Sequence, residues 1–559
     1  MKKTVCLSLL LVFAHILFAQ DESRTKGLNA IRKDVIKAQL EFLASDWTEG
    51  RETATPGAYM AADYIASLYQ IYGLQPGGDH EWTDVSREER REGKRPEKYR
   101  SYFQNFKLIK ADESTDNLLG IKTADKDRSH TTYFDYQTDY SFYGSSTTGL
   151  AFEADVVFVG YGYVNGENNY DDYRGVDVEG KIILRLPGYP GFDDTTSKAY
   201  QTFTPEEGYR SYWYKMRREK DKIAREKAVL AVIDIPYGDI PDSWAKNYPF
   251  RYNLPYYEGD VRQKTTYDYS LHLPEDTLKT NVHDITVSKR LYHKLIEGED
   301  LDIEAYKKRA ADKLKPGAME LKGKRIVFNT RPQTQIVQAR NVIGVIEGKK
   351  SDEIIVVGAH YDHLGKSDGY IWNGADDNAS GTVAVMTMAR AMMESGIQPE
   401  KTIVFACWTG EEKGLLGSRY FVENPYGDTI EHIILNMNYD MISRDPYGDT
   451  LGVKGYMSYF EDFPILKELT EKHIEEFDLN LDFNLRPSAG GRGGSDHAPF
   501  SMKGIPFSFV ITGMHEDYHR PTDHVSKVNY DKMLDVIKLG YLNLWELANV
   551  VDFKKQKKD

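Results

Sequence analysis

Cysteine is almost absent from this chain: Cys6 and Cys407 are the only two among 559 residues. Cys6 lies in an apolar N-terminal run that we expect to be removed, which leaves Cys407 alone and excludes an internal disulfide in the mature protein. The apolar run from Thr402 to Trp408 around Cys407 is typical of a buried strand, where a thiol is inert. The protein must therefore rely on its core for stability.

Long apolar runs are also scarce. The one candidate, Val5 to Phe18, follows two lysines and is followed by Ala19. A basic start, a short apolar run and a small residue are typical of a signal peptide, which we predict for residues 1–20. The run is short for a membrane span, and a retained anchor is the alternative. After removal of the signal we expect no membrane span, and a location in the periplasm or outside the cell.

An excess of positive charge is lacking as well, since the formal net charge is −14. This argues against nucleic acid and anionic membranes as partners, because both attract basic surfaces. Hydrophobic residues make up 40% of the chain, enough for a large core. We find no internal repeat and no low-complexity segment, and the length predicts two or more domains.

The apolar pattern changes twice after the signal. Residues 21–129 begin with helical spacing and end in strand-like alternation. Residues 130–320 carry short strands, many tyrosines and glycines and one charged helix, which indicates an inserted β-rich domain. In residues 321–559, apolar strands such as Ile354–Ala359 alternate with helical patterns. This alternation predicts an α/β fold in which a mixed sheet is sandwiched by helices.

Polar residues follow several of these predicted strands. The segment VVGAHYDHLG ends a strand at His360 and Asp362, and NGADDNASG brings Asp377 to a helix entrance. Further candidates follow later strands or lie in the late loop GMHEDYHRPTD: Glu411, Glu412, Asp440, Tyr518 and His519. Ligands gather beyond the strand ends of such sheets, so we expect these side chains on one face.

Two histidines and several carboxylates suit a pair of divalent ions. The ions can share one bridging carboxylate and hold a water whose pKa falls towards neutrality. Neighbouring side chains point in different directions, so one of Glu411 and Glu412 can bind metal while the other acts as general base. A tyrosine beside His519 can donate to a developing oxyanion.

Six motifs together resemble one family. They are GAHYDHLG, NGADDNASGT, WTGEEKGLLGSRYF, NMNYDM, GGSDHAPF and YHRPTD, and they cover most of residues 350–525 in the family's order. The chain resembles the co-catalytic zinc aminopeptidases of the bacterial leucine aminopeptidase and aminopeptidase Y type, in the form with a protease-associated (PA) domain. Glutamate carboxypeptidase and the transferrin receptor are more distant members. The resemblance implies the zinc exopeptidase fold, with a PA domain inserted at 130–320.

The resemblance also implies which residues bind two Zn2+ ions. The implied ligands are His360, Asp377, Glu412, Asp440 and His519. Asp377 would bridge the ions, because it stands directly before Asn-Ala-Ser-Gly as the family's bridging ligand does. His360 and Asp440 would complete one site, and Glu412 and His519 the other. The family also has a cis peptide after the bridging residue, so we expect one between Asp377 and Asn378.

Three further residues receive roles from the resemblance. Glu411 matches the general base, Asp362 matches the carboxylate behind His360, and Tyr518 matches the oxyanion donor.

For some neighbouring residues we favour other roles. We expect Asp376 to cap the helix entrance. His363 is expected to support the site or face solvent, and His515 to be a surface or loop residue. Asp496 and His497 are not needed as ligands.

The implied function is that of an exported di-zinc exopeptidase, an aminopeptidase that hydrolyses N-terminal residues from peptides. A carboxypeptidase of the glutamate carboxypeptidase type is an alternative, with Arg486 and Arg492 as candidate contacts for a C-terminal carboxylate. Arg492 also matches a substrate-contacting arginine of the aminopeptidases. A glutaminyl cyclase with one zinc and a binding protein without metals are further alternatives, and the intact ligand set argues against both. The sequence leaves open the side-chain preference, the role of the PA domain and a homodimer.

Overall fold

The protein is described from a computed structural model. The structure describes residues 21–112, 114, 116–125, 128–136, 138–143, 147, 149–204, 209–235, 269–278, 283–367, 369–427, 429–491 and 493–553. The predicted signal peptide, residues 1–20, lies outside them. The chain divides into two compact units: the first comprises the described residues up to 108 and from 337 onward, and the second those from 109 to 336.

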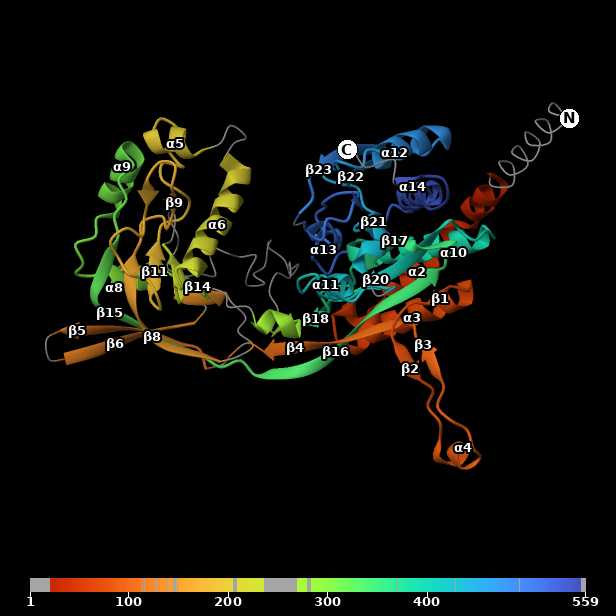
Figure 1. The fold of residues 1–559 in the computed structure, drawn as a ribbon, viewed down its shortest axis with the longest axis horizontal. Helices are drawn as coiled ribbons and strands as arrows, with labels where there is room; N and C mark the ends of the chain where they lie inside the picture. The colour runs from red at the N-terminus through yellow and green to blue at the C-terminus, as the bar shows by residue number, and fades with distance from the viewer. Residues whose placement is uncertain are drawn as a thin grey trace. The chain divides into compact units, whose positions relative to one another are not determined.

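A mixed sheet forms the centre of the first unit (Figure 1). Its strands run in the order β4, β16, β20, β17, β21, β24, β22, β23, and β1 pairs with β16. The bounds are β1 (Gln75–Pro76), β4 (Phe103–Asp112), β16 (Thr334–Ile346), β17 (Lys350–His360), β20 (Lys401–Trp408), β21 (Ile433–Tyr439), β22 (Lys454–Phe460), β23 (Asp482–Ser488) and β24 (Phe507–Ile511). β20, β17, β21 and β24 are parallel, whereas β16 and β22 pair antiparallel with β20 and β24.

Helices cover both faces of this sheet. α10 packs against β17, β20 and β21 and contacts α2, α3 and α14, while α11 and α13 pack together, with α13 against β21 and β24. The bounds are α2 (Lys33–Leu43), α3 (Pro56–Tyr72), α10 (Gly381–Glu394), α11 (Leu416–Glu423), α12 (Ile465–Glu476), α13 (His497–Met502) and α14 (Tyr530–Asn549). From Ile354 onward, β17 is apolar without alternation because both of its faces are buried there. The predicted mixed sheet between helices is confirmed.

Short elements complete the first unit. They are η1 (Asp46–Arg51), β2 (His80–Trp82), α4 (Arg87–Arg91), β3 (Lys98–Arg100), β18 (Lys366–Ser367), β19 (Tyr370–Ile371), η4 (Ala375–Ser380), η5 (Ile430–His432) and η6 (Val525–Lys527). β2 and β3 form an antiparallel pair that carries α4. No residue of α4 is buried, as the charged sequence of this helix requires.

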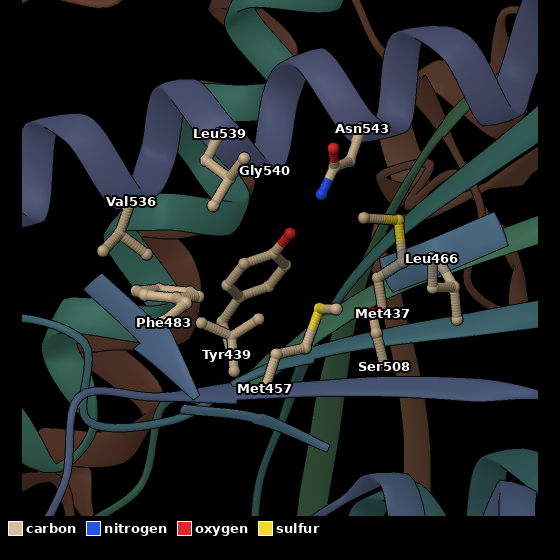
Figure 2. A pocket seen from close by; sticks show the side chains of 11 residues that line it. Met437, Tyr439, Met457, Leu466, Phe483, Ser508, Val536, Leu539, Gly540 and Asn543 are labelled. Carbon is tan, nitrogen blue, oxygen red and sulfur yellow. The ribbon is translucent and has the colours of Figure 1, made fainter. Parts of the chain in front are cut away.

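A small pocket lies where α14 packs on the sheet (Figure 2). Val536, Leu539, Gly540 and Asn543 of α14 line it together with strand residues that include Tyr439. A Cβ at residue 540 would lie 2.7 Å from the Tyr439 hydroxyl, so the close approach requires glycine. None of the predicted ligands lines this pocket, which separates it from the candidate site.

The second unit is built on another mixed sheet, in the order β6, β5, β15, β8, β11, β12, β14, β7. β8, β11, β12 and β14 are parallel. The elements of this unit are β5 (Leu118–Asp125), β6 (Arg128–Phe134), β7 (Tyr140–Tyr143), β8 (Leu150–Phe158), β9 (Val164–Asn165), β10 (Tyr170–Asp171), β11 (Ile182–Arg185), α5 (Lys198–Phe203), α6 (Tyr209–Glu226), β12 (Ala231–Asp234), β13 (Tyr269–His272), η3 (Pro274–Leu278), β14 (His283–Val287), α8 (Lys289–Ile296), α9 (Ile303–Lys313) and β15 (Met319–Thr330). The predicted insertion, 130–320, lies inside this unit, and its assignment as a PA domain stays a prediction.

Across the part of the chain that the structure describes, none of the helices combines the length and the apolar character of a membrane span.

Candidate metal centre

The candidate site lies at the carboxyl ends of three neighbouring parallel strands. β17 ends at His360, β20 ends three residues before Glu411, and Asp440 directly follows β21. Because the strands are parallel neighbours, their ends meet at one edge of the sheet. The side chains that the sequence places after separate strands are therefore brought together.

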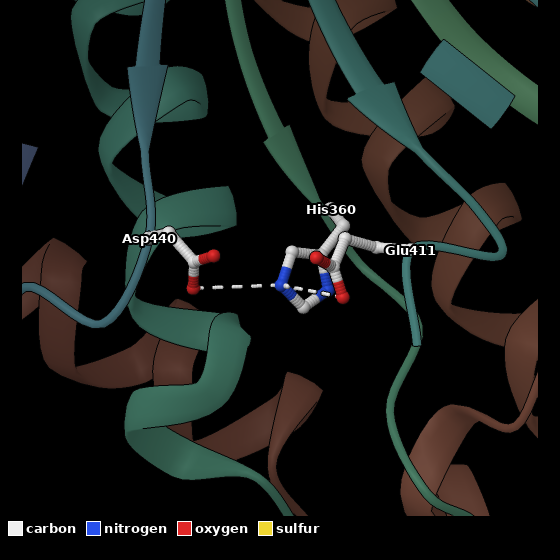
Figure 3. Close-up of side chains that lie close together, drawn as sticks. All are labelled: His360, Glu411 and Asp440. Atoms are coloured by element: carbon white, nitrogen blue, oxygen red, sulfur yellow. Dashed lines mark ion pairs between the residues drawn. The ribbon is translucent and has the colours of Figure 1, made fainter. Parts of the chain in front are cut away.

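His360 stands at the centre of the first group of predicted ligands. Its Nε2 atom lies 3.5 Å from Asp440 Oδ1 and 3.6 Å from Asp377 Oδ1. The carboxylate of Glu411 is slightly farther, with 3.9 Å between His360 Nε2 and Glu411 Oε2. Figure 3 shows the imidazole between the carboxylates of Asp440 and Glu411.

His519 stands at the centre of the second group. Its Nε2 atom lies 3.2 Å from Asp377 Oδ2 and 3.3 Å from Glu412 Oε2. Asp377 thus belongs to both groups, and each of its two oxygens faces a different histidine. The peptide bond between Asp377 and Asn378 is cis, as the resemblance implies.

The donor atoms fit a divalent metal. Ligands at ~2.0–2.1 Å in a tetrahedral arrangement are separated by about 3.3 Å, close to the spacing found here. Asp440 gives an independent indication: its Oδ2 accepts a hydrogen bond from Ser495 Oγ at 2.7 Å, whereas its buried Oδ1 faces His360 and has no hydrogen-bond partner among the described residues. A buried carboxylate oxygen without a partner is costly unless a cation binds it. Imidazole and carboxylate donors suit zinc.

His363 also reaches the second group. It is fully buried, and its Nδ1 atom lies 2.8 Å from Glu412 Oε1. His363, Asp377 and Glu412 offer atoms close enough to share an ion. However, His363 Nδ1 is 3.9 Å from Asp377 Oδ2, farther than His519 Nε2 from the same oxygen. The geometry therefore favours His519 as the ligand and His363 as the neighbour that holds Glu412.

Asp362 supports His360 in two ways. The backbone carbonyl of Asp362 lies 3.1 Å from His360 Nδ1, and its carboxylate Oδ1 lies 3.7 Å from the same nitrogen. The carboxylate is held from behind, because it accepts hydrogen bonds from Thr53 Oγ1 at 2.9 Å and from Glu411 N at 3.2 Å. A partner on Nδ1 leaves the Nε2 of His360 free to bind a metal.

The adjacent residues Glu411 and Glu412 differ in their affinity for a proton. Burial, reinforced by Glu412, Asp496 and Asp440, raises the pKa of Glu411 well above its usual value, although His360 opposes this. Burial also acts to raise the pKa of Glu412, but His519 and His363 outweigh it and hold that pKa well below the usual value. The two environments thus separate the pKa values of the adjacent carboxyl groups, so that Glu411 can carry a proton while Glu412 stays ionised.

Tyr518 lies beside the second group. Its ring stacks on the imidazole of His519 with 3.8 Å between ring centres. Burial and the surrounding carboxylates raise the pKa of Tyr518 well above its usual value, so the hydroxyl keeps its proton. A protonated phenol at this position is available as a hydrogen-bond donor.

The loop before Asp377 is fixed by residues that the sequence did not single out. Asp523 accepts hydrogen bonds from the backbone N–H groups of Asp376 at 3.0 Å and of Asp377 at 3.1 Å. Asp376 is not a helix cap: it accepts hydrogen bonds from Ser443 N and Oγ, and His515 Nε2 lies 3.1 Å from its Oδ2. His515 is therefore buried support for the site rather than a surface residue. The only sequence signal for Asp523 was its place in the YHRPTD motif.

Two other neighbours of the site, Asp496 and His497, have partners outside the predicted ligand set. Asp496 is buried and accepts a hydrogen bond from Ser418 Oγ. The His497 ring stacks on Phe507 and Phe509. Arg492 lies outside the described residues.

Comparison with known proteins bears on this site. Residues 341–541 match the profile of Peptidase family M28, and this range contains all five predicted ligands. This part of the chain resembles peptidase family M28. Leupeptin-inactivating enzyme 1 from Streptomyces exfoliatus is 31% identical over 188 residues, which are 34% of this chain and 38% of that protein. A probable leucine aminopeptidase from Trichophyton verrucosum (strain HKI 0517) is 30% identical over 217 residues, 37% of this chain and 57% of that protein.

The matched part of the chain thus spans 38% and 57% of the length of these two curated relatives. The solved structure of an aminopeptidase from Aneurinibacillus sp. strain AM-1 superimposes with a TM-score of 0.53. The alignment covers 95% of this chain and 97% of that one at 18% sequence identity, which shows a common fold. The predicted family resemblance and the predicted fold are confirmed.

Proposed function

We propose that the chain is a metal-dependent exopeptidase, an aminopeptidase that removes N-terminal residues from peptides. The observation that carries this proposal is the position of Asp377 between His360 and His519, with one carboxylate oxygen 3.6 Å and the other 3.2 Å from the two imidazoles. A ligand that serves two ions needs this arrangement. The match of residues 341–541 to family M28 supports peptide hydrolysis as the reaction.

The proposed cofactor is a pair of zinc ions. His360 and Asp440 would hold one, Glu412 and His519 the other, and Asp377 both. When bound, the ions would polarise the scissile carbonyl and lower the pKa of water. Cobalt and manganese are the alternatives at the second position.

The protein's own groups would move the proton. Glu411 would accept a proton from the attacking water and return it to the leaving amine. Its raised pKa and its place next to a predicted ligand, Glu412, suit this role. The Tyr518 hydroxyl would donate a hydrogen bond to the developing oxyanion.

The charge at the site favours a substrate with a free amino group. The carboxylate of Glu411, which is not a predicted metal ligand, would pair with an ammonium group. A carboxypeptidase would need an arginine that faces the substrate. Arg486 is exposed on β23, and its guanidinium lies over the Tyr456 ring instead. Peptides with free N-termini are therefore the proposed substrates.

We also propose that the protein is exported, to the periplasm or beyond. The sequence pattern of residues 1–20 supports this. Cell fractionation combined with mass spectrometry of the mature N-terminus tests it: a chain that starts near residue 21 is expected outside the cytoplasm, and a full-length cytoplasmic chain contradicts it.

The activity is tested with a panel of aminoacyl-nitroanilides beside N-blocked peptides, with and without a chelator. We expect cleavage of the free-amine substrates alone, lost with chelator and restored by zinc. Cleavage of N-blocked peptides from the C-terminus would support a carboxypeptidase. A zinc-loaded protein that cleaves neither class would contradict the proposal, and cyclisation of N-terminal glutamine would be the next test.

A further inference from the structure

The segment Gly50–Thr53 lies directly behind the candidate metal centre. The backbone carbonyl of Gly50 accepts a hydrogen bond from Gly365 N at 3.0 Å, and that of Arg51 accepts one from His363 N at 3.2 Å. The segment thus lies alongside the residues that come after β17, although about 310 positions separate the two in sequence. It also lies outside residues 341–541, which match the family profile.

Arg51 joins two parts of the site. Its side chain is fully buried and donates only to backbone carbonyls. Nε bonds to Tyr361 O at 2.7 Å, Nη1 to Leu43 O and to Asn373 O at 2.6 Å, and Nη2 to Gly374 O at 2.9 Å. A guanidinium holds its donors in a rigid plane, so these carbonyls are fixed relative to one another.

The carbonyls that Arg51 holds belong to the chain next to two predicted ligands. Tyr361 directly follows His360, and Gly374 begins the turn that leads to Asp377. One side chain therefore sets the position of the strand end that carries His360 relative to the loop that carries Asp377. Burial lowers the pKa of Arg51 to about 10 while nearby carboxylates oppose this, so the side chain remains a cation at neutral pH.

Two neighbours of Arg51 hold the other side of the site. Thr53 Oγ1 donates to Asp362 Oδ2 at 2.9 Å, and Asp362 in turn accepts from Glu411 N. Glu52 Oε1 lies 2.9 Å from Lys413 Nζ in a buried ion pair. The segment therefore contacts the turn that carries the proposed general base.

The backbone of the segment is unusual. Gly50 has φ +71° and a Cβ there would lie 2.4 Å from Gly365 O, so only glycine fits. Glu49, Arg51 and Ala54 also have positive φ values, of 48°, 50° and 63°. Non-glycine residues in this region persist where the surroundings over-determine them, and they cluster at functional sites.

We propose that residues 50–53 are a positioning element of the metal centre, and that Arg51 is the positioning residue that fixes the separation of His360 from Asp377. Only the kinetic part of the test rests on the proposed function, because zinc binding can be measured without a substrate.

The test compares Arg51→Met and Arg51→Lys with the wild type. Arg340→Met is the matched control: Arg340 bonds to Tyr59 O and Asp63 in the same unit and donates to none of the loops at the site. Zinc affinity is measured by competition with a chelating dye, and the geometry of the site by the absorption spectrum of the cobalt-substituted protein. We expect Arg51→Met to lower zinc affinity by about 10–100-fold and to change the cobalt spectrum.

Arg51→Lys is expected to recover only part of the loss, because one ammonium group cannot replace a planar fork of donors. On a free-amine peptide, kcat should fall in Arg51→Met while KM changes by less than about threefold, since the loss is in ligand geometry rather than substrate contact. Arg340→Met should match the wild type in zinc affinity and spectrum. A folded Arg51→Met with wild-type affinity and spectrum would overturn the inference.

A second pair of variants, with smaller changes in the side chain, tests the inference if Arg51→Met does not fold. Thr53→Val removes the hydrogen bond to Asp362 without a change in shape, and Thr53→Ser keeps it. We expect about tenfold weaker zinc binding in Thr53→Val and wild-type binding in Thr53→Ser. Equal affinity in both would contradict the inference. A wild type that binds zinc but cleaves no peptide would overturn the proposed function, while the affinity differences would still test residues 50–53.

Discussion

His363 Nδ1 lies 2.8 Å from Glu412 Oε1, while the second oxygen of the same carboxylate lies 3.3 Å from His519 Nε2. Glu412 is thus held through one oxygen and presents the other to the candidate metal position. We predict that His519→Ala loses one of two zinc ions, whereas His363→Ala keeps both with about tenfold weaker affinity, because partners of ligands typically contribute 10–100-fold. Zinc content after dialysis and a competition titration measure both effects.

The opposite pattern would exchange the two roles. One ion in His363→Ala and two in His519→Ala would make His363 the ligand. His432→Ala is a suitable control, since this histidine lies in η5, directly before β21, whereas Asp440 follows the other end of that strand.

Glu411→Gln should abolish most activity and keep the metal. Glu411 Oε2 is 3.9 Å from His360 Nε2, farther than either predicted ligand oxygen. Loss of a general base costs about 10²–10⁴-fold in kcat, so we expect a decrease in that range with wild-type zinc content. Glu423→Gln, an exposed site at the end of α11, controls for the substitution itself. A Glu411→Gln protein that holds less zinc would make Glu411 a ligand.

Asp377→Asn should weaken both metal positions at once. An amide cannot present two anionic oxygens, and here the oxygens face His360 and His519 separately. We expect a loss of more than about 100-fold in affinity for both ions, beyond the effect of any supporting residue. Zinc titration of the variant beside Asp462→Asn, an exposed control, gives the comparison. Loss of only one ion would show that Asp377 does not bridge.

We expect the buried carboxyl group of Asp172, in the second unit, to make the free energy of unfolding depend on pH. It is buried and accepts hydrogen bonds from Tyr161 N, Tyr163 N and the hydroxyls of Tyr170 and Tyr306. Burial raises its pKa to about 7 despite these donors. Between pH 4 and 7 the folded state then keeps a proton that the unfolded chain has lost, so this group lowers the free energy of unfolding as pH rises through that window.

The variant Asp172→Asn removes this titration. Between pH 5 and pH 7.5, the free energy of unfolding of the wild type should fall by about 2 kcal/mol more than that of the variant. Urea unfolding at both pH values, followed by circular dichroism, measures the difference. An equal gap between the two proteins at both pH values would mean that Asp172 is ionised in the folded state throughout.

The clustering of the predicted ligand side chains could be predicted from the sequence, because each follows a strand or lies in a recognisable motif. His360 and Asp440 come after parallel neighbours, so a pattern along the chain becomes a cluster at one sheet edge. The mixed sheet was predictable because a stretch buried on both faces, such as Ile354–Ala359 of β17, forms an unbroken apolar run.

The supporting contacts of Arg51, Asp376 and Asp523 were not predictable, although that of Asp362 was. Arg51 lies in a polar segment that contains glycine and proline, and its carbonyl partners carry no side-chain signal. His515 and Asp523 reach Asp376 across 139 and 147 positions of chain. Which loop packs against which strand depends on the packing of the whole unit, and the apolar periodicity of the sequence carries no information about it.

The most direct test of the account is anomalous X-ray diffraction at the zinc edge from crystals of the zinc-loaded protein. We predict two peaks, one among His360, Asp377 and Asp440, and the other among Asp377, Glu412 and His519. A single peak, or a pair in which the carboxylate of Asp377 contacts only one ion, would contradict the shared-ligand centre.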